Sequence, residues 1–170
     1  MNYIEGLGQK AQKAKKSLAT ASTGQKNEIL TRIAAKLLEN QEQILAENEK
    51  DIANARENGI SETMVDRLRL TPERIQGISD ACIQLTNLED PVGEIIEGST
   101  RPNGMKISKI RVPMGVVGII YESRPNVTVD AASLCIKSGN AAILRGGKEA
   151  ICSNTVSYTH LRAHETDQYL

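Results

Sequence analysis

The chain has 170 residues, and its 21 lysines and arginines are balanced by 21 aspartates and glutamates, so the formal net charge is zero. That length fits one domain, and a charged fraction of 25% with a hydrophobic fraction of 39% is typical of globular rather than disordered proteins. Charge balance argues against a general nucleic-acid or membrane-surface binder, because both need an excess of basic residues.

The cysteine pattern and the N-terminal residues indicate the cellular compartment in which the protein is expected. Cys82, Cys135 and Cys152 are odd in number and stand at unrelated spacings, so they predict neither a disulfide framework nor a paired-cysteine metal site. Basic residues near the N-terminus are not followed by the apolar stretch of a secretory signal, and no apolar run is long enough to cross a bilayer. We therefore expect a reduced, cytoplasmic protein with no bound metal.

Residues 1–90 have the pattern of successive helices. Apolar side chains recur at helical spacing from Ile4 to Leu18, with lysines on the remaining faces. Ser22 followed by Gln25 three residues later is a capping-box signal, and apolar residues continue at helical spacing beyond it. The sequence therefore predicts a helical region over residues 1–90.

Later in this region, Gly59 predicts the end of one helix, and Thr71-Pro72 predicts the beginning of another. Cys82 falls on the apolar stripe of that last helix. A free cysteine in such a place is usually a small buried hydrophobic residue, so we expect Cys82 to lie in the core.

Two extended segments follow, at about 94–100 and 105–112, with Arg101-Pro-Asn-Gly104 between them. An Asn-Gly pair between extended segments is typical of a hairpin turn. The second segment has basic and apolar side chains on both faces, so neither face is suited to a core. Residues 91–113 are therefore predicted to form a hairpin arm that meets another chain or lies at an edge.

The pattern then changes to strand, helix and strand. A continuous apolar run at 116–121 is typical of a parallel strand buried on both faces, and 141–144 is a second short buried strand. Between them, 127–136 is apolar enough to pack on a sheet, and Ser138-Gly139-Asn140 ends that helix. Residues 114–156 are therefore predicted to contain a right-handed βαβ unit.

Ligands of open α/β sheets bind beyond the carboxyl ends of the strands, which here are 121–126 and 145–148. Both segments carry polar and cationic side chains where helix N-termini favour anions. Arg124, Arg145 and Lys148 point to a phosphate-bearing ligand, and the alternative is that they cap carbonyl groups or face solvent. Neither a Gly-x-Gly-x-x-Gly fingerprint nor a P-loop is present.

The last fourteen residues, 157–170, have no obvious relation to the preceding sequence. They hold both histidines and show neither helical nor alternating apolar spacing. Because histidines four residues apart share a helix face, His160, His164 and Glu165 allow a metal-site interpretation. We expect instead an unstructured tail that is not part of the evolved sequence, since it resembles translated adapter sequence at the ends of draft gene models.

Five segments resemble the gamma-glutamyl phosphate reductase family, whose members are also called glutamate-5-semialdehyde dehydrogenases. They are Asp66-Arg-Leu-Arg-Leu-Thr71, Asp90-Pro-Val-Gly93, Arg111-Val-Pro-Met-Gly115, Tyr121-Glu-Ser-Arg-Pro-Asn-Val-Thr128 and Lys137-Ser-Gly-Asn-Ala-Ala-Ile-Leu-Arg-Gly-Gly147. The resemblance extends in order along nearly the whole chain, as far as about Val156, and its segment 121–128 is highly specific. The resemblance as a whole implies an α/β, aldehyde dehydrogenase-like fold. Residues 1–90 would be the helical part of the cofactor domain, 91–113 the oligomerisation hairpin, and 114–156 the start of a Rossmann-like NADP-binding sheet.

The resemblance also implies an activity, namely NADPH-dependent reduction of L-glutamate 5-phosphate to L-glutamate 5-semialdehyde and phosphate in proline biosynthesis. It implies a homo-oligomer and a functional association with glutamate 5-kinase. The mechanism that the resemblance implies is attack of a cysteine thiolate on the acyl phosphate while an amide donor stabilises the oxyanion. Asn126 is the candidate donor, and the alternative is that it caps the following helix.

The remaining site residues that the resemblance implies belong to the cofactor. Cofactor-binding roles are expected for Tyr121, Glu122, Ser123, Arg124, Arg145, Gly147 and Lys148. Within this set Arg145 is expected to meet the extra phosphate that distinguishes NADPH, and Lys148 is expected to share that task.

The family pattern continues well beyond this length, and its nucleophilic cysteine lies downstream of this sequence. Cys135 stands late in the predicted crossover helix, where the helix dipole disfavours a thiolate, and Cys152 follows the glycine turn on the cofactor side. We therefore expect an N-terminal fragment without reductase activity of its own. The alternative is a helical interaction module with 91–156 as a dimerisation appendage.

A third hypothesis is nucleic-acid binding through basic residues near the N-terminus. It is weak, because no aromatic side chain for base stacking stands beside these lysines. They are Lys10, Lys13, Lys15 and Lys16.

Overall fold

The structure, a computed structural model, describes residues 3–162, with side chains described for residues 4–157. The first five helices are α1 (Tyr3–Thr20), α2 (Thr23–Glu39), α3 (Gln41–Glu57), α4 (Glu62–Leu68) and α5 (Pro72–Thr86). The later elements are β1 (Ile95–Thr100), β2 (Lys106–Ile110), β3 (Val116–Ile120), α6 (Asn126–Lys137), β4 (Ala141–Arg145), a short 3-10 turn at Lys148–Ala150, and α7 (Ile151–Arg162). None of the described helices is long and apolar enough to cross a membrane.

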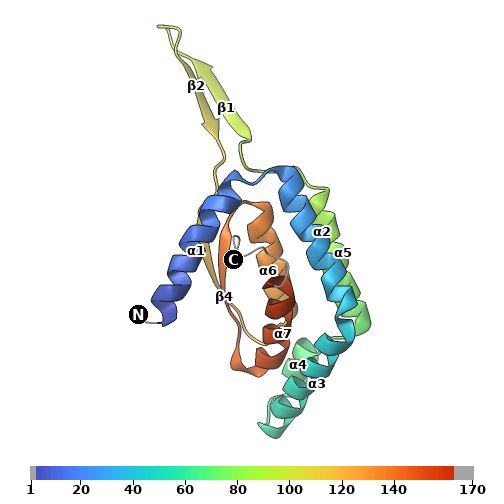
Figure 1. Cartoon of the computed structure of the whole chain (residues 1–170). Coiled ribbons are helices and arrows are strands. Elements are labelled where there is room, and N and C mark those ends of the chain that lie inside the picture. Colours follow the sequence, from blue (N-terminus) through green and yellow to red (C-terminus); the bar gives the residue numbers. More distant parts are fainter. Residues whose placement is uncertain (1–2, 163–170) are drawn as a thin grey trace.

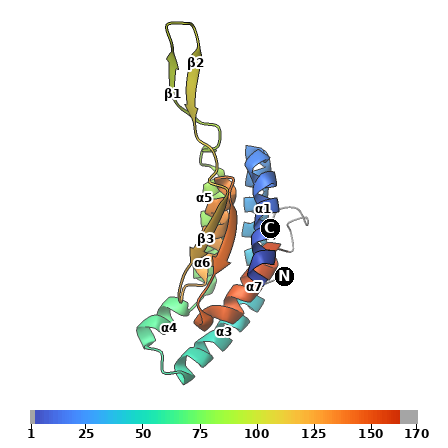
Figure 2. The ribbon, with the colours of Figure 1, turned by 90° about the vertical axis from the view of Figure 1, so that its left-hand side faces the viewer.

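The parallel pair of β3 and β4 lies between helices (Figures 1 and 2). Helix α1 packs on one face of this small sheet and α6 on the other, while α2 and α5 form a layer beyond α6. Helices α3 and α4 lie at the end of the molecule opposite the β1–β2 hairpin, and α7 packs along α3. The predicted strand–helix–strand unit is confirmed, since β3 and β4 run parallel with α6 between them in the chain.

One hydrophobic core joins these layers. Its buried members include Leu18 of α1, Leu30 of α2, Ile75 of α5, Val129 of α6 and Ala141 of β4. Because each helix contributes one apolar stripe, burial of these stripes against the sheet and each other stabilises the arrangement. Cys82 lies in the same core and is 1% exposed, which confirms the prediction made from its place on the apolar stripe.

The predicted helix signals in the N-terminal half are confirmed. Ser22 and Gln25 form the capping box at the start of α2, and the Thr71 side chain accepts a hydrogen bond from the Arg74 backbone at the start of α5. Asn58 ends α3, with Gly59 following it. These signals depend only on neighbouring residues, so the sequence is sufficient to locate them.

The β1–β2 hairpin projects from the body of the molecule (Figures 1 and 2). Its strands pair antiparallel, and the predicted turn is confirmed by a hydrogen bond from the Arg101 backbone amide to the Met105 carbonyl. Every residue of both strands is exposed, including Ile95, Ile107 and Ile110. The hairpin therefore makes no part of the core of this chain, and its contact with another chain stays a prediction.

The prediction that 116–121 is buried on both faces is wrong. Strand β3 is only partly buried, and Ile120 at its end is 75% exposed. Among the described residues β3 pairs only with β4, so each strand keeps one edge without a partner strand. A fully buried parallel strand needs partner strands on both edges as well as helices on both faces, and among the described residues β3 has a partner strand on one edge only.

The prediction of an unstructured tail from residue 157 is wrong for its first part. Helix α7 continues to Arg162, and Ser157 is buried. A helix that has begun propagates by one hydrogen bond per residue, which does not require an apolar stripe. The side chains of His160, His164 and Glu165 lie outside the described residues. The structure therefore does not test whether these three residues form a metal site.

Replacing Gly139 by alanine should lower the free energy of unfolding by about 2–4 kcal/mol. This glycine ends α6 with φ of 72°, and an added Cβ would lie 2.9 Å from Pro113 Cγ and 3.2 Å from Val92 Cγ2. Urea denaturation measures the change. Gly8→Ala in α1 is the matched control, since its Cβ would meet no atom within 4 Å and should stabilise the helix. Equal effects of the two changes would contradict the assignment.

Candidate functional site

The predicted cofactor residues lie where the carboxyl ends of β3 and β4 meet. The Tyr121 backbone amide donates to the Arg145 carbonyl at 3.0 Å. A Cβ placed on Gly147 would lie 3.5 Å from the Glu122 Cα. We call residues 121–123 with 145–149 the strand-end surface. The two segments that the sequence analysis singled out therefore lie side by side.

A chain of hydrogen bonds fixes the Tyr121 ring on this surface. The Tyr121 hydroxyl lies 2.5 Å from Thr128 Oγ1, and Thr128 Oγ1 donates to Asn154 Oδ1 at 2.9 Å. Because a threonine hydroxyl has one proton, the phenol must be the donor to Thr128. Burial raises the pKa of Tyr121 above its ordinary value, although the hydrogen bond with Thr128 acts to lower it. The tyrosine therefore stays protonated and ties the end of β3 to α6 and α7.

The strand-end surface also holds groups with unused bonding capacity. Oε2 of Glu149 is buried without a hydrogen-bond partner, and a Cβ on Gly147 would lie 2.1 Å from it. Arg145 and Lys148 are exposed, and neither forms an ion pair within the described part of the chain. The glycine thus leaves room for the carboxylate, and two cations remain available to an anionic ligand.

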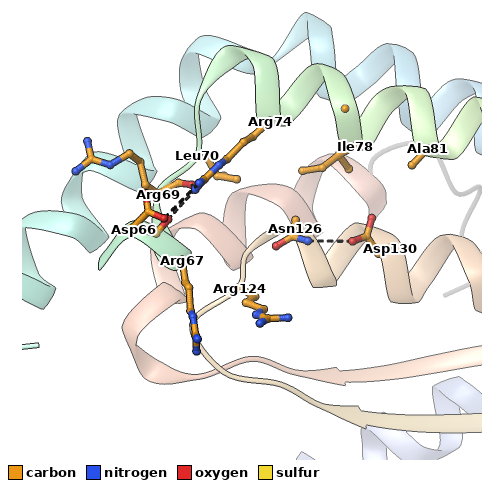
Figure 3. A pocket seen from close by; sticks show the side chains of 11 residues that line it. Asp66, Arg67, Arg69, Leu70, Arg74, Ile78, Ala81, Arg124, Asn126 and Asp130 are labelled. Carbon is orange, nitrogen blue, oxygen red and sulfur yellow. Dashed lines mark hydrogen bonds and ion pairs between the residues drawn. The ribbon is translucent and has the colours of Figure 1, made fainter. Parts of the chain in front are cut away.

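Arg124 and Asn126 lie elsewhere, in a cavity of about 500 Å³ between α4, α5 and α6 (Figure 3). Ser123, which has φ of 43°, turns the chain from the strand-end surface toward this cavity. We call it the arginine cavity and define it by its lining residues. They are Asp66, Arg67, Arg69, Leu70, Arg74, Gly77, Ile78, Ala81, Arg124, Asn126 and Asp130.

Asn126 is the first residue of α6, and its side chain lines the arginine cavity. Its Nδ2 donates to Asp130 Oδ2 at 3.0 Å, and the helix has Pro125 at its N-cap with no side-chain cap. The alternative that Asn126 caps the helix is therefore wrong. Burial raises the pKa of Asp130, while the hydrogen bond from Asn126 acts in the opposite direction. An amide nitrogen has two protons, so one remains for a ligand.

The four arginines of the cavity differ in their partners. Arg74 donates to the carbonyls of Asp66 and Arg69, each at 2.6 Å, and lies 3.5 Å from the Asp66 carboxylate. Arg67 donates a weak hydrogen bond to the sulfur of Met64, at 3.9 Å. In Figure 3 Arg74 turns toward Asp66, whereas Arg67 and Arg124 extend away from this pair. Arg74 therefore shapes the wall of the cavity.

The remaining arginines are available to a ligand. Neither Arg67, Arg69 nor Arg124 forms an ion pair with any described residue. An unpaired guanidinium beside an amide donor is suited to carboxylate or phosphoryl oxygens, because its planar fork binds two of them at once.

A buried polar network holds the segment that carries these arginines. Asn48 Oδ1 accepts from the Leu70 backbone at 2.7 Å, while its Nδ2 donates to the Leu68 carbonyl and to Ser153 Oγ. Asp51 accepts from the backbone of Ser153 and from its hydroxyl at 2.8 and 2.7 Å. Helix α3 therefore joins the arginine segment to the beginning of α7.

The cysteines of the chain have the properties of structural thiols. Burial is the largest influence on each, and it raises the pKa of Cys82, Cys135 and Cys152. Asp51 raises the pKa of Cys152 further, against a smaller effect of Lys50. A thiol with a raised pKa is mostly protonated near neutral pH and is a poor nucleophile.

The α4–α5 side of the arginine cavity was not predicted from the sequence. The segment 66–71 carries part of the family resemblance, but no role was expected for its arginines. The only available signal was the repeated arginine spacing in Asp66-Arg-Leu-Arg-Leu-Thr71. Glu149 and Asp130 were missed as well, because neither follows a recognisable motif. Among the described residues, no group of three or more metal-ligating side chains is present.

Comparisons with known proteins agree with this architecture. No protein-family model matches the chain. A gamma-glutamyl phosphate reductase of Thermobifida fusca is 56% identical over 153 residues, which are 90% of this chain and 37% of the relative. The crystal structure of gamma-glutamyl phosphate reductase from Thermotoga maritima matches with a TM-score of 0.93 and 42% identity, over 95% of this chain and 39% of that one.

The chain is similar to part of gamma-glutamyl phosphate reductase. The resemblance recognised in the sequence is thereby confirmed. A probable aldehyde dehydrogenase from Listeria monocytogenes matches with a TM-score of 0.66 at 19% identity, over 94% of this chain and 32% of that one. The expected aldehyde dehydrogenase-like fold is therefore also confirmed. The chain spans about 37% of the length of the curated relatives it matches.

Proposed function

We propose that this chain is part of a gamma-glutamyl phosphate reductase, which reduces L-glutamate 5-phosphate to L-glutamate 5-semialdehyde and phosphate with NADPH in proline biosynthesis. One observation carries the proposal. The arginine cavity brings the Asn126 amide together with guanidinium groups that have no acidic partner among the described residues. An acyl phosphate needs both, because charge develops on its carbonyl oxygen while its phosphoryl group leaves.

The nucleophile of this reaction is a cysteine thiolate, which we place outside residues 1–170 because burial raises the pKa of all three cysteines here. The thiolate attacks the carbonyl carbon, the bond from that carbon to the phosphate oxygen breaks, and a thioester remains on the enzyme. The second N–H of Asn126 Nδ2 donates a hydrogen bond to the oxyanion, while Arg67 and Arg124 bind the departing phosphate. The bound cofactor supplies the hydride that reduces the thioester.

The strand-end surface fits a nicotinamide dinucleotide phosphate. The unpartnered Oε2 of Glu149 is an acceptor suited to a sugar hydroxyl, and this carboxylate occupies the place that a Cβ at residue 147 would take. Arg145 and Lys148 supply positive charge without an acidic partner in the described residues. Residues 121–123 form the opposite side of this surface. We therefore assign cofactor binding to Tyr121, Glu122, Ser123, Arg145, Gly147 and Lys148, and we reassign Arg124 to the substrate.

Replacing Arg145 by alanine should raise the KM for NADPH about 10- to 100-fold and leave the KM for NADH nearly unchanged. Loss of one charge-assisted phosphate contact costs about 1.5–3 kcal/mol, and NADH has no phosphate at that position. Steady-state kinetics of the complete protein with both cofactors measure the ratio. Arg32→Ala, an exposed arginine of α2, is the control. Equal effects on both cofactors would show that Arg145 does not bind the extra phosphate.

The same proposal extends to partners and location. The exposed β1–β2 hairpin, with Ile95, Ile107 and Ile110 uncovered, is suited to the subunit contact of a homo-oligomer. Glutamate 5-kinase is the expected functional partner, because it makes the labile acyl phosphate that this reaction consumes. A cytoplasmic location agrees with a reaction that uses phosphorylated metabolites and with three free cysteines.

The reverse reaction tests the proposal. The complete protein encoded by the gene is supplied with NADP⁺, phosphate and L-glutamate 5-semialdehyde, and NADPH absorbance is followed. We expect turnover that depends on phosphate, and a flat trace from the 170-residue chain alone. A flat trace from the complete protein would overturn the proposal and favour the helical interaction module.

A further inference from the structure

Asp130 is the acidic group of the arginine cavity that no cation neutralises. It is half-buried on α6 and lines the cavity. It accepts a hydrogen bond from the neutral amide of Asn126, and it forms no ion pair with any described lysine or arginine. The other acid of the cavity, Asp66, is paired with Arg74. A half-buried carboxylate without a cation is costly, so a positively charged ligand group would stabilise it.

The cavity as a whole therefore has a mixed charge pattern. Asp130 offers one negative site, and Arg67 and Arg124 offer positive sites without acidic partners among the described residues, whereas the Arg69 side chain extends away from the cavity (Figure 3). Its volume of about 500 Å³ is within the ordinary range for a small-molecule site. A complementary ligand has one cationic and two anionic groups. A purely anionic acyl phosphate would leave Asp130 unsatisfied and facing like charge.

We propose that Asp130 binds the α-ammonium group of the substrate and so restricts the enzyme to acyl phosphates that carry a free α-amino group. The proposal rests on the proposed reductase function and names what its substrate site recognises. The arginines then receive the two anionic groups, the α-carboxylate and the phosphoryl group. Discrimination follows because an analogue without the ammonium loses a charge-assisted hydrogen bond and leaves the carboxylate unpaired.

A merely structural role makes a different prediction. Asp130 also accepts the hydrogen bond of Asn126, so its loss disturbs the oxyanion donor. An effect through Asn126 would slow every substrate equally, since every substrate forms the same oxyanion. An effect on the ammonium would appear only with substrates that have one. The comparison of two aldehydes therefore separates recognition from positioning.

The test uses the complete protein, its Asp130→Asn variant and two aldehydes in the reverse direction. The aldehydes are L-glutamate 5-semialdehyde and 5-oxopentanoate, which is the same molecule without the α-amino group. For Asp130→Asn we expect kcat/KM to fall about 10- to 100-fold with the amino aldehyde, mainly through KM, and to stay level or rise with 5-oxopentanoate. Equal losses with both aldehydes, or no loss with either, would overturn the proposal.

Asp80→Asn is the matched control. Asp80 accepts from Gln76 Nε2 at 2.8 Å across one turn of α5, as Asp130 does from Asn126, but it is exposed and does not line the cavity. This variant should leave both aldehydes unchanged. A loss of selectivity equal to that of Asp130→Asn would contradict the assignment.

A binding measurement separates this proposal from the reductase function. Calorimetry with L-glutamate and with glutarate, which lacks the amino group, needs no turnover. We expect the complete protein to prefer L-glutamate and the Asp130→Asn variant to lose that preference. Such binding without reductase activity would sustain the role of Asp130 while refuting the reaction. Turnover without any dependence on Asp130 would do the reverse, and no preference together with no turnover would refute both.

Discussion

Replacing Asp90 by alanine is expected to lower the free energy of unfolding by about 3–5 kcal/mol, because it leaves a buried lysine without its partner. The side chain of Lys26 is 1% exposed, and its Nζ lies 2.9 and 3.0 Å from the two carboxylate oxygens of Asp90. Thr23 and the Val92 backbone also donate to this carboxylate. Asp90 therefore links the chain at the base of the hairpin to α2 through Lys26 and Thr23.

The double variant Lys26→Met with Asp90→Ala is the control for this prediction. Removing both charges takes away the uncompensated lysine, so the double variant should regain at least half of the lost stability. Urea denaturation with a constant m-value measures each change. Equal losses in the single and double variants would show that the two side chains do not act as a pair.

The contribution of Asp90 should also depend on pH. Burial, the largest influence, opposes its ionisation, but the hydrogen bonds from Lys26, Val92 and Thr23 and the charge of Lys26 outweigh it. They hold the pKa of Asp90 below its ordinary value. The stabilisation is therefore fully present above the unfolded pKa of about 3.9, and it is lost as pH falls through the lower folded pKa. The difference between wild type and Asp90→Ala should shrink below about pH 4.

Replacing Asn126 by alanine in the complete protein should lower kcat about 10²- to 10³-fold with little change in KM, because an oxyanion donor acts mainly in the transition state. The described hydrogen bonds of its side chain reach only Asp130 on the same helix, so the fold should persist. The reverse reaction with L-glutamate 5-semialdehyde measures kcat. Asn54→Ala, on the exposed face of α3, is the control. An unchanged kcat would remove Asn126 from the catalytic role.

Part of the candidate site could be predicted from the sequence because it follows from chain order. Parallel strands joined by a helix place their carboxyl ends together, so Tyr121, Arg145 and Gly147 were predicted to share one surface. The structure brings these segments together, with the Tyr121 amide bonded to the Arg145 carbonyl. Their role in cofactor binding remains a proposal that the kinetics of Arg145→Ala will test.

The other half of the site could not be predicted in this way. The arginine cavity is lined by residues of α4, α5 and α6, and in the chain α6 is separated from the other two helices by the hairpin and β3. The pairing of Lys26 with Asp90 spans 64 residues. Similarly, the exposure of Ile120 depends on which strands and helices surround β3, since its own apolar run is typical of a buried strand.

The sequence by itself determined the local elements of this protein. Capping residues at Ser22 and Thr71, the turn before Met105 and the apolar periods act over a few residues, where hydrogen bonds and helix or strand spacing are set. Only the tertiary structure decided which charges are neutralised and which remain for a ligand. That difference is physical, because burial and pairing of a charge depend on side chains brought together from distant parts of the chain.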